Sequence, residues 1–404
     1  MDMFSKGRST GVRGIAPSVR ITQLLREQGT ASQAEIARRT GLGKSTVSRV
    51  VAELQRSGVV IEAGRSLPPA GGASGRPAAA LTLNPANGIC VGLQIGLDSI
   101  RAVLADVSHA VLATRVAPLA LDFTPSEGLE AARRLIDEVQ DAAGTSPGRL
   151  LGIGIAVPSP VHPRTGRVIR SSIIGTWGGI EIARLFEATL GRPVVVDNES
   201  NCAALAEFTW GAARGHADVV YYKIEGGVGG AVIANGRLVR GVAGGAGEFG
   251  HIVLDPNGPV CRCGHRGCFE LYLAIPALLR LLRPTYGEDV TVQRMIDLAR
   301  SGDAGCRRVI ADAAEIAGRG IAIACNMFNP ELVVVAGALT DAADLLLTPL
   351  RHALSRHALI PVRGDESGAA TALVLASLGE DASALGAMGL ALRQIGGAAD
   401  AQQI

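Results

Sequence analysis

Three cysteines stand within eight residues of this 404-residue chain: Cys261, Cys263 and Cys268. Thiolates at this density are typical metal ligands, and Gly264 and Gly267 allow the backbone to fold closely around an ion. Zinc is the expected metal, and a tetrahedral structural site needs one more ligand, for which His251 and His265 are both candidates. Three free cysteines, the alternative, would be exposed and oxidisable. A disulfide framework explains the spacing less well, because the chain is large and holds seven cysteines.

A second functional region is expected at the N-terminus. Residues 1–84 hold 12 Lys and Arg against 5 Asp and Glu, whereas the rest of the chain is net acidic. A basic segment joined to an acidic body is typical of a nucleic-acid-binding module attached to a small-molecule domain, with a basic disordered tail as the alternative. Apolar residues at helical spacing predict one helix from Pro17 to about Gly29 and a second one capped by Thr30 or Ser32.

A third helix is predicted over residues 44–54, after a glycine-containing turn at 40–43. Its apolar residues recur at spacings of three and four, so its outer face begins polar and basic. Helix, helix, turn and helix form a helix-turn-helix, whose last helix reads the major groove, whereas a purely structural three-helix cap is the alternative. The expected DNA-facing residues, which contact bases or phosphates, are Lys44, Ser45, Thr46, Ser48 and Arg49.

Residues 58–62 and 81–83 are predicted to be the two strands of a wing. The loop between them is rich in Gly, Pro and Ala, and within it Gly75-Arg76-Pro77 places a guanidinium on an extended backbone. That geometry suits insertion of Arg76 into a narrow minor groove. A flexible linker that merely carries Arg76 is the alternative.

The remainder of the chain shows two similar sets of strands. The first set is expected at 89–97, 100–107, 110–116, 150–157 and 194–196, with a helix over about 126–143. The second set is expected at 219–224, 228–234 and 333–337, with a hairpin turn at Asn235-Gly236. A repeated strand-hairpin-strand-helix plan predicts two α/β lobes around a ligand-binding cleft.

The segment Gly247-Glu248-Phe249-Gly250-His251, followed by the cysteine cluster and Glu270, resembles the signature of the ROK family of repressors and sugar kinases. The resemblance covers roughly residues 85–395, and the winged helix ahead of it is similar to the repressor branch with xylose- and N-acetylglucosamine-type regulators. It implies a two-lobed, actin-like (ribonuclease-H-like) α/β fold and a homodimer or homotetramer.

The same resemblance implies roles for individual residues. It makes His251, Cys261, Cys263 and Cys268 the zinc ligands, and so favours His251 over His265. The residues that it places in the sugar pocket are Asn198, Glu248, His251 and Glu270. Surface glutamates beside a zinc loop are the alternative for the carboxylates.

Three departures from the kinase pattern argue against phosphoryl transfer. Where kinases of the family resemble Asp-x-Gly-Gly-Thr, this chain has Gln94-Ile95-Gly96-Leu97-Asp98, and the second phosphate loop has become Glu225-Gly226-Gly227-Val228-Gly229-Gly230. Both changes bring carboxylates toward a triphosphate. The catalytic aspartate of the family falls on Glu199, whose extra methylene displaces the carboxylate, so Glu199 is expected to line the pocket and not to catalyse.

These observations predict a sugar-responsive, DNA-binding transcriptional regulator, expected to repress carbohydrate-metabolism genes and to have no enzymatic activity. An ATP-dependent sugar kinase with an appended DNA-binding head is the alternative. The expected organisation is a flexible N-terminus at 1–16, a winged helix-turn-helix and linker at 17–84, and a ROK domain at 85–404 with its zinc loop at 251–270. The absence of a signal or a long apolar run predicts a cytoplasmic location without a membrane partner.

Overall fold

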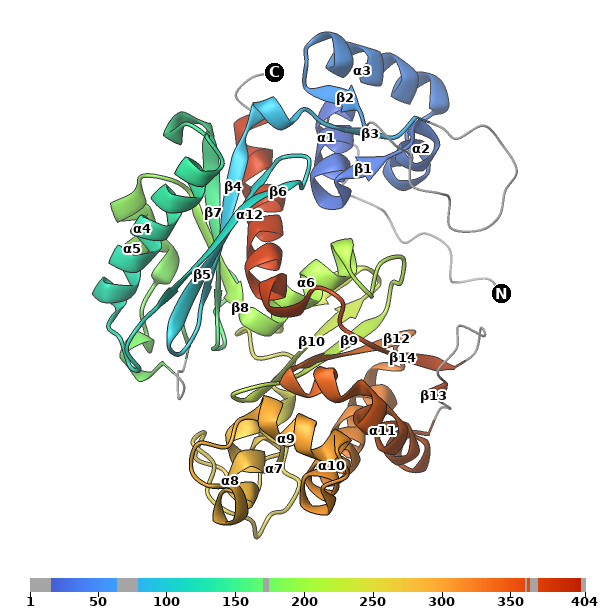
Figure 1. Ribbon diagram of the computed structural model, residues 1–404. Helices are drawn as coiled ribbons and strands as arrows, with labels where there is room; N and C mark the ends of the chain where they lie inside the picture. Colours follow the sequence, from blue (N-terminus) through green and yellow to red (C-terminus); the bar gives the residue numbers. More distant parts are fainter. Residues whose placement is uncertain (1–15, 64–78, 170–173, 360–361, 364–369, 401–404) are drawn as a thin grey trace, which may run out of the picture.

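The computed structural model describes residues 16–63, 79–169, 174–359, 362–363 and 370–400. These residues form a small N-terminal domain and two lobes, each lobe built on one β-sheet (Figure 1). The predicted α/β class, with two lobes behind a winged helix-turn-helix, is confirmed. The predicted flexible segment and Arg76 lie in ranges outside the described residues, apart from Ala16.

The N-terminal domain contains three helices and a three-stranded sheet: α1 (Pro17–Gln28), β1 (Thr30–Ala31), α2 (Gln33–Thr40), α3 (Lys44–Arg56), β2 (Val60–Glu62) and β3 (Leu81–Leu83). Ser32 Oγ accepts a hydrogen bond from the backbone N–H of Glu35 at 3.2 Å, so Ser32, and not Thr30, caps α2. Thr30 belongs instead to β1, which pairs with β3 and was not predicted. Strands β2 and β3 form the predicted wing.

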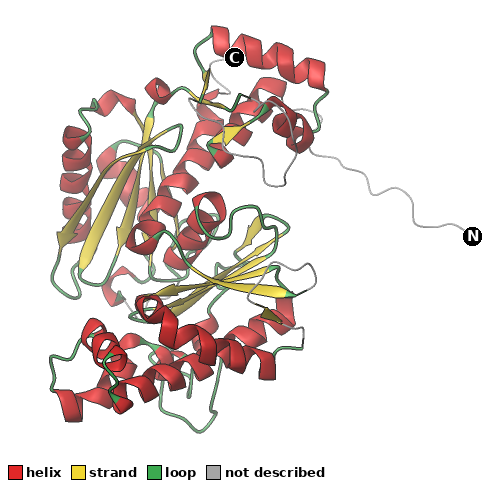
Figure 2. Ribbon diagram, turned by 45° about the vertical axis from the view of Figure 1, so that its right-hand side comes forward, coloured by secondary structure: helices red, strands yellow, loops and turns green. Residues whose placement is uncertain are grey.

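The first lobe carries a five-stranded sheet in the order β6-β5-β4-β7-β8. Its elements are η1 (Pro85–Asn87), β4 (Ile89–Ile95), β5 (Ser99–Asp106), β6 (Val111–Pro118), α4 (Pro125–Ala142), η2 (Pro147–Arg149), β7 (Leu150–Val157), η3 (Gly175–Trp177), α5 (Ile182–Leu190), β8 (Val194–Asn198) and α6 (Glu199–Trp210). Helix α4 begins with a capping box between Thr124 and Glu127 and buries one apolar stripe. Figure 2 shows helices on both sides of this sheet.

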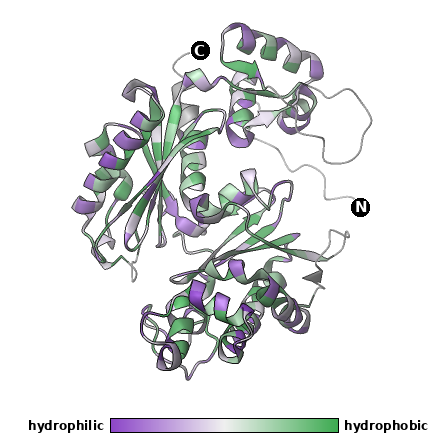
Figure 3. Cartoon of the chain, viewed as in Figure 1, coloured by the Kyte–Doolittle hydropathy of each residue, from purple (hydrophilic) through white to green (hydrophobic). Residues whose placement is uncertain are grey.

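The second lobe carries a six-stranded sheet in the order β11-β10-β9-β12-β14-β13. Its elements are β9 (Val219–Ile224), β10 (Val228–Ala234), β11 (Arg237–Val239), η4 (Phe249–His251), α7 (Glu270–Leu273), α8 (Ile275–Tyr286), α9 (Val292–Arg300), α10 (Ala304–Phe328), β12 (Leu332–Gly337), η5 (Ala338–Ala342), α11 (Ala343–His357), β13 (Val362–Arg363), β14 (Thr371–Leu375) and η6 (Gly379–Asp381). Figure 3 shows that the strands of both sheets are mainly hydrophobic, as expected for sheets covered by helices.

The last helix, α12 (Ala382–Asp400), returns from the second lobe and packs on β4, β7 and α6 of the first (Figure 1). Two glycines make this possible, because a β-carbon on Gly92 or Gly154 would collide with the backbone carbonyl of Ala384 or Ala387 in α12. The chain therefore completes the core of its first lobe with its C-terminal residues. Among the described residues, no helix is both long and apolar enough to cross a bilayer.

Candidate functional site: a metal cluster beside three carboxylates

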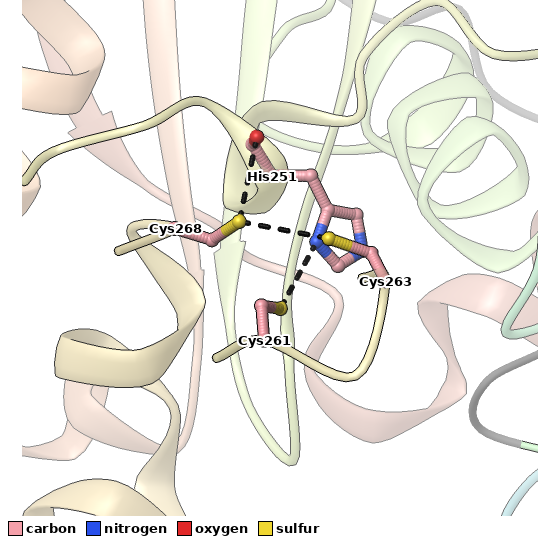
Figure 4. Close-up of side chains that lie close together, drawn as sticks. All are labelled: His251, Cys261, Cys263 and Cys268. Atoms are coloured by element: carbon pink, nitrogen blue, oxygen red, sulfur yellow. Dashed lines mark hydrogen bonds between the residues drawn. The ribbon is translucent and has the colours of Figure 1, made fainter. Parts of the chain in front are cut away.

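The side chains of His251, Cys261, Cys263 and Cys268 converge, with all four candidate ligand atoms within 4.8 Å of one another (Figure 4). The Sγ atom of Cys261 lies 3.7 Å from Nδ1 of His251, and the Sγ atoms of Cys263 and Cys268 lie 3.6 Å apart. In a tetrahedron with Zn–S bonds of about 2.3 Å, two sulfurs stand about 3.8 Å apart. The four residues therefore fit a metal ion at their centre.

The loop between these ligands is closed by its own backbone. The N–H of Cys261 donates to the carbonyl of His265 at 2.7 Å, and that of Gly264 donates to the carbonyl of Cys261 at 2.9 Å. Gly267 has a φ of +61°, and a β-carbon there would collide with the carbonyl of Asp255. Nδ1 of His265 lies 3.5 Å from Sγ of Cys263, but His265 is not part of the four-residue cluster.

Glu270 follows the cluster directly and is held by an arginine that the sequence analysis did not select. Arg262 donates from Nε to Oε1 of Glu270 at 2.8 Å and from Nη2 to Oε2 at 2.7 Å. The backbone N–H of Val228 donates to Oε2 as well, at 3.3 Å. Arg262 stands between two cysteine ligands, so its place in the loop was visible in the sequence, but nothing there indicated its partner.

Glu248 lies between His251 of the metal cluster and the carboxylate of Glu270. Its Oε2 is 4.0 Å from Nε2 of His251, the ring nitrogen turned away from the cysteines. Burial, together with the nearby carboxylate of Glu270, raises the pKa of Glu248 to about 7. At a pKa of about 7, both the protonated and the ionised form of Glu248 are populated near neutral pH, so this residue can donate a hydrogen bond as well as accept one.

Asn198 and Glu199 enter the same region from the start of α6. Oδ1 of Asn198 accepts from the N–H groups of Ser200 and Asn201, and its Nδ2 donates to the carbonyl of Ser159. Asn198 is thus the N-cap of α6, and its oxygen is already committed to the helix. Glu199 is paired with Lys223 Nζ at 3.5 Å, a partner that the sequence analysis did not identify.

The three predicted pocket carboxylates share one electrostatic environment, since Glu199 and Glu270 are both close enough to contribute to the raised pKa of Glu248. They come from three elements far apart in sequence: α6, the turn η4 and the start of α7. The structure thus brings the side chains of Glu199, Glu248 and Glu270 close together, as the predicted sugar pocket requires.

The two segments that the family resemblance compares with phosphate loops, 94–98 and 225–230, lie close to each other. Cδ1 of Leu97 lies 3.6 Å from the position that a β-carbon on Gly226 would take. Beside it, burial raises the pKa of Glu225, which nonetheless accepts a hydrogen bond from the N–H of Ala338. These two segments thus carry an apolar side chain and a carboxylate, neither of which would stabilise a triphosphate.

The predicted DNA-facing residues lie on the first two turns of α3. Lys44, Ser45, Ser48 and Arg49 are exposed and Thr46 is partly exposed, whereas Val47, Val50, Val51 and Leu54 are buried. Arg49 forms an exposed ion pair with Glu53 at 2.8 Å. Such a surface pair contributes at most about 1 kcal/mol, so it leaves the guanidinium free to exchange partners.

Comparison with known proteins agrees with this geometry. Residues 90–394 match the model of the ROK family. The chain belongs to the ROK family. Residues 21–66 match the model of the MarR family, within the winged helix-turn-helix region. The xylose repressor of Bacillus spizizenii is 32% identical over 355 residues, which cover 88% of this chain and 89% of that protein.

Two solved structures extend the comparison. One is described as a ROK family transcriptional regulator, a homolog of the E. coli MLC protein. It superposes with a TM-score of 0.76 at 21% identity, covering 96% of this chain and 98% of that one. The other, a ROK family glucokinase from Streptomyces griseus, gives a TM-score of 0.65 at 28% identity, covering 75% of this chain and 99% of that one. The part of the chain that the glucokinase covers is about the length of the two lobes alone.

Proposed function

We propose that this ROK protein is a sugar-responsive regulator of transcription that represses genes of carbohydrate metabolism. The observation that carries the proposal is that one chain joins an exposed polar helix, α3, to a ROK domain in which Glu199, Glu248 and Glu270 lie close together. The name of its relative, a xylose repressor, supports the same reading. A protein of this kind acts on operator DNA in the cytoplasm.

In this proposal Lys44, Ser45, Thr46, Ser48 and Arg49 contact DNA, with Arg76 reaching the minor groove. A monosaccharide binds at Asn198, Glu199, Glu248, His251 and Glu270. The protonated form of Glu248 can donate to a sugar hydroxyl, while the carboxyl oxygens of Glu270, held by Arg262, can accept from one. The two domains expected from the sequence, at 17–84 and 85–404, serve these two activities.

We propose Zn²⁺ as the ion of the His251 and Cys261, Cys263 and Cys268 cluster, because three thiolates and an imidazole are a preferred zinc ligand set. Bound zinc would supply a structural cross-link that fixes the loop at 251–270. His251 would then face the metal with Nδ1 and the cleft with Nε2, so that the metal site orients one wall of the sugar pocket.

Repression requires two recognition helices, one for each half-site of an operator, so we propose that the protein works as a homodimer or homotetramer. Sugar binding would close the cleft and change the spacing or orientation of the two heads. Half-sites lie about one helical turn apart, so a displacement of a few ångströms would alter DNA affinity.

The test is a titration of purified zinc-loaded protein onto duplex DNA selected by binding from a random pool. We expect D-xylose, D-glucose or N-acetyl-D-glucosamine to weaken binding. Lys44→Ala should lower DNA affinity across sequences and reduce the salt dependence by about one charge, whereas Arg134→Ala, which removes a charge from the exposed side of α4, should not. A protein that selects no DNA sequence, or that ignores every sugar, would not be this regulator.

The second candidate is an ATP-dependent sugar kinase with a DNA-binding head, favoured by the carboxylate of Glu199 and by the likeness to the Streptomyces griseus glucokinase. The ion pair of Glu199 with Lys223 and the contact of Leu97 with Gly226 argue against it. Production of ADP with a panel of sugars would establish kinase activity, and we expect none above background.

A further inference from the structure

A histidine joins the DNA-binding domain to the sensor. His109, in the turn between β5 and β6, lies between the carbonyl of Arg26 in α1, 2.8 Å from Nε2, and the indole of Trp210 in α6, 2.9 Å from Nδ1. The indole N–H can only donate, so Nδ1 must accept and Nε2 must carry the proton that it donates to Arg26. One imidazole thus connects its own turn to α1 and to α6, two segments that are far from it in sequence.

An arginine makes a second connection beside the first. Arg393 of α12 donates from Nη2 to the carbonyl of Glu27 at 3.3 Å and to Oγ1 of Thr209 at 2.8 Å. The carbonyls of Arg26 and Glu27 belong to the last turn of α1, where a helix has no partners of its own for its acceptors. The end of α1 is therefore completed by His109 and Arg393, which both also hold the end of α6.

Apolar packing adds to these hydrogen bonds between the DNA-binding domain and the first lobe. The apolar core of the DNA-binding domain does not stop at its boundary but includes residues of β4, β5 and α12: Cys90, Ala105, Val107, Met388, Ala391 and Leu392. The head is consequently seated on the first lobe and is not simply tethered to it.

The opposite end of α6 lies beside Glu248, one of the predicted pocket residues. Asn198 caps it there, and Glu199, its first residue, pairs with Lys223 of the second lobe. Nine of the twelve residues of α6 are buried, so it has almost no solvent-facing side. A helix of twelve residues extends about 18 Å. Close packing on all sides favours displacement of such a helix as a unit over bending.

Helix α6 is also attached firmly to the second lobe. The buried carboxylate of Glu207 accepts from the N–H groups of Ser377 and Leu378, in the segment that follows β14, and from the N–H of Ala212. Ala203 and Ala204 pack against β9 and β10 of the same lobe. Helix α6 also packs on α12 of the first lobe, so it lies between the two lobes, and a rotation of one lobe against the other must change its contacts on at least one side.

We propose that α6 transmits the state of the cleft to the DNA-binding domain, and that His109 and Trp210 are the positioning residues that join α6 to the end of α1. The inference rests on the proposed function for the event that moves α6. It specifies the route within this chain, which the family relationship leaves open.

The test is a double-mutant cycle on the full-length protein, read by hydrogen–deuterium exchange of the amides at 27–29 in the last turn of α1. Asn198→Ala removes the cap of α6 at its cleft end, and Trp210→Phe keeps an aromatic ring but removes the donor to His109. The matched control is Thr291→Ala, which removes the cap of α9. Urea unfolding of each variant separates local from global loosening.

We expect Asn198→Ala to lower the protection of the 27–29 amides by about fivefold, and by less than about twofold when Phe already stands at position 210. The proposal would be overturned if Asn198→Ala lowered protection equally with Trp or Phe at position 210. It would also be overturned if Thr291→Ala lowered the protection of the 27–29 amides as much as Asn198→Ala does. The cycle uses neither sugar nor DNA, so its failure would leave the proposed function standing. Conversely, the absence of any sugar effect on DNA affinity would refute the proposed function without bearing on the cycle.

Discussion

Arg262 and Glu270 form a two-point ion pair, with Nε to Oε1 at 2.8 Å and Nη2 to Oε2 at 2.7 Å. Arg262 precedes the ligand Cys263, and Glu270 follows the ligand Cys268, so the pair closes the metal loop onto the start of α7. Glu270 is buried, with 8% of its side chain exposed, and an unpaired carboxylate at such a position would be costly. The pair thus connects the cysteine loop to Glu270, one of the predicted pocket residues.

Arg262→Met should lower the free energy of unfolding by about 1–3 kcal/mol, because it leaves the carboxylate of Glu270 without its cation. Zinc-loaded protein unfolded in urea provides the measurement. Arg266→Met is the matched control, since Arg266 is exposed in the same loop and makes one hydrogen bond, to the carbonyl of Gly258 at 3.4 Å. Equal stability of the two variants would show that the pair contributes nothing.

Measuring the metal content of two variants tests whether His251 or His265 is the fourth ligand of the metal. His251→Ala should reduce bound zinc well below one ion per chain, whereas His265→Ala should retain it, because only His251 belongs to the four-residue cluster. Metal analysis after dialysis gives the result directly. Loss of zinc from His265→Ala alone would reverse the assignment.

Removing the metal should loosen a defined part of the chain. A chelator is expected to increase amide exchange over 251–270 first, since the loop is held mainly by its ligands and a few backbone hydrogen bonds. The sheet of the first lobe, buried under α12, serves as the internal reference. Uniform loosening of both regions would contradict a local structural role.

The contact of His109 predicts a pH dependence. Burial lowers the pKa of His109 from 6.5 to about 4, with the charge of Arg393 lowering it further and the carbonyl of Arg26 and the carboxylate of Asp106 opposing the shift. Between pH 4 and 6.5 the unfolded chain binds more protons at His109 than the folded chain does. The contribution of His109 to the free energy of unfolding is therefore complete above about pH 6.5 and is lost as the pH falls toward 4. The loss is at most about 3 kcal/mol.

His109→Asn isolates this effect, because asparagine tolerates the positive φ of 76° found here but does not titrate. Its unfolding free energy should vary less than that of the wild type between pH 4 and 6.5. Parallel profiles for the two proteins would mean that His109 titrates normally.

The packing of α12 predicts a sensitive glycine. Gly154→Ala would press a β-carbon against the backbone carbonyl of Ala387, and α12 would have to move, at a cost of about 3 kcal/mol or more. Gly148→Ala is the control, since a β-carbon there meets no atom within 4 Å. Denaturation midpoints compare the two, and equal midpoints would contradict the close approach.

The local pattern of residue types was sufficient to predict many of the helices and strands of this protein. The helices of the head, the wing strands and most strands of both lobes followed from apolar spacing, because such spacing reports directly which face an element buries. The cysteine spacing indicated a metal loop, since its ligands are close in sequence. For the same reason the sequence alone left His251 and His265 as alternatives until the family resemblance favoured one of them.

Contacts between distant segments were decided only by the tertiary structure. Nothing in the sequence around Arg262 points to Glu270, and Lys223 gives no sign of Glu199, because the ion pairs depend on how loops and strands meet in space. The placement of α12 in the first lobe, and the meeting of His109, Trp210 and Arg26, likewise join residues about 80 or more positions apart. Periodicity describes an element and its buried face, whereas the identity of the partner on that face is fixed by the packing of the whole chain.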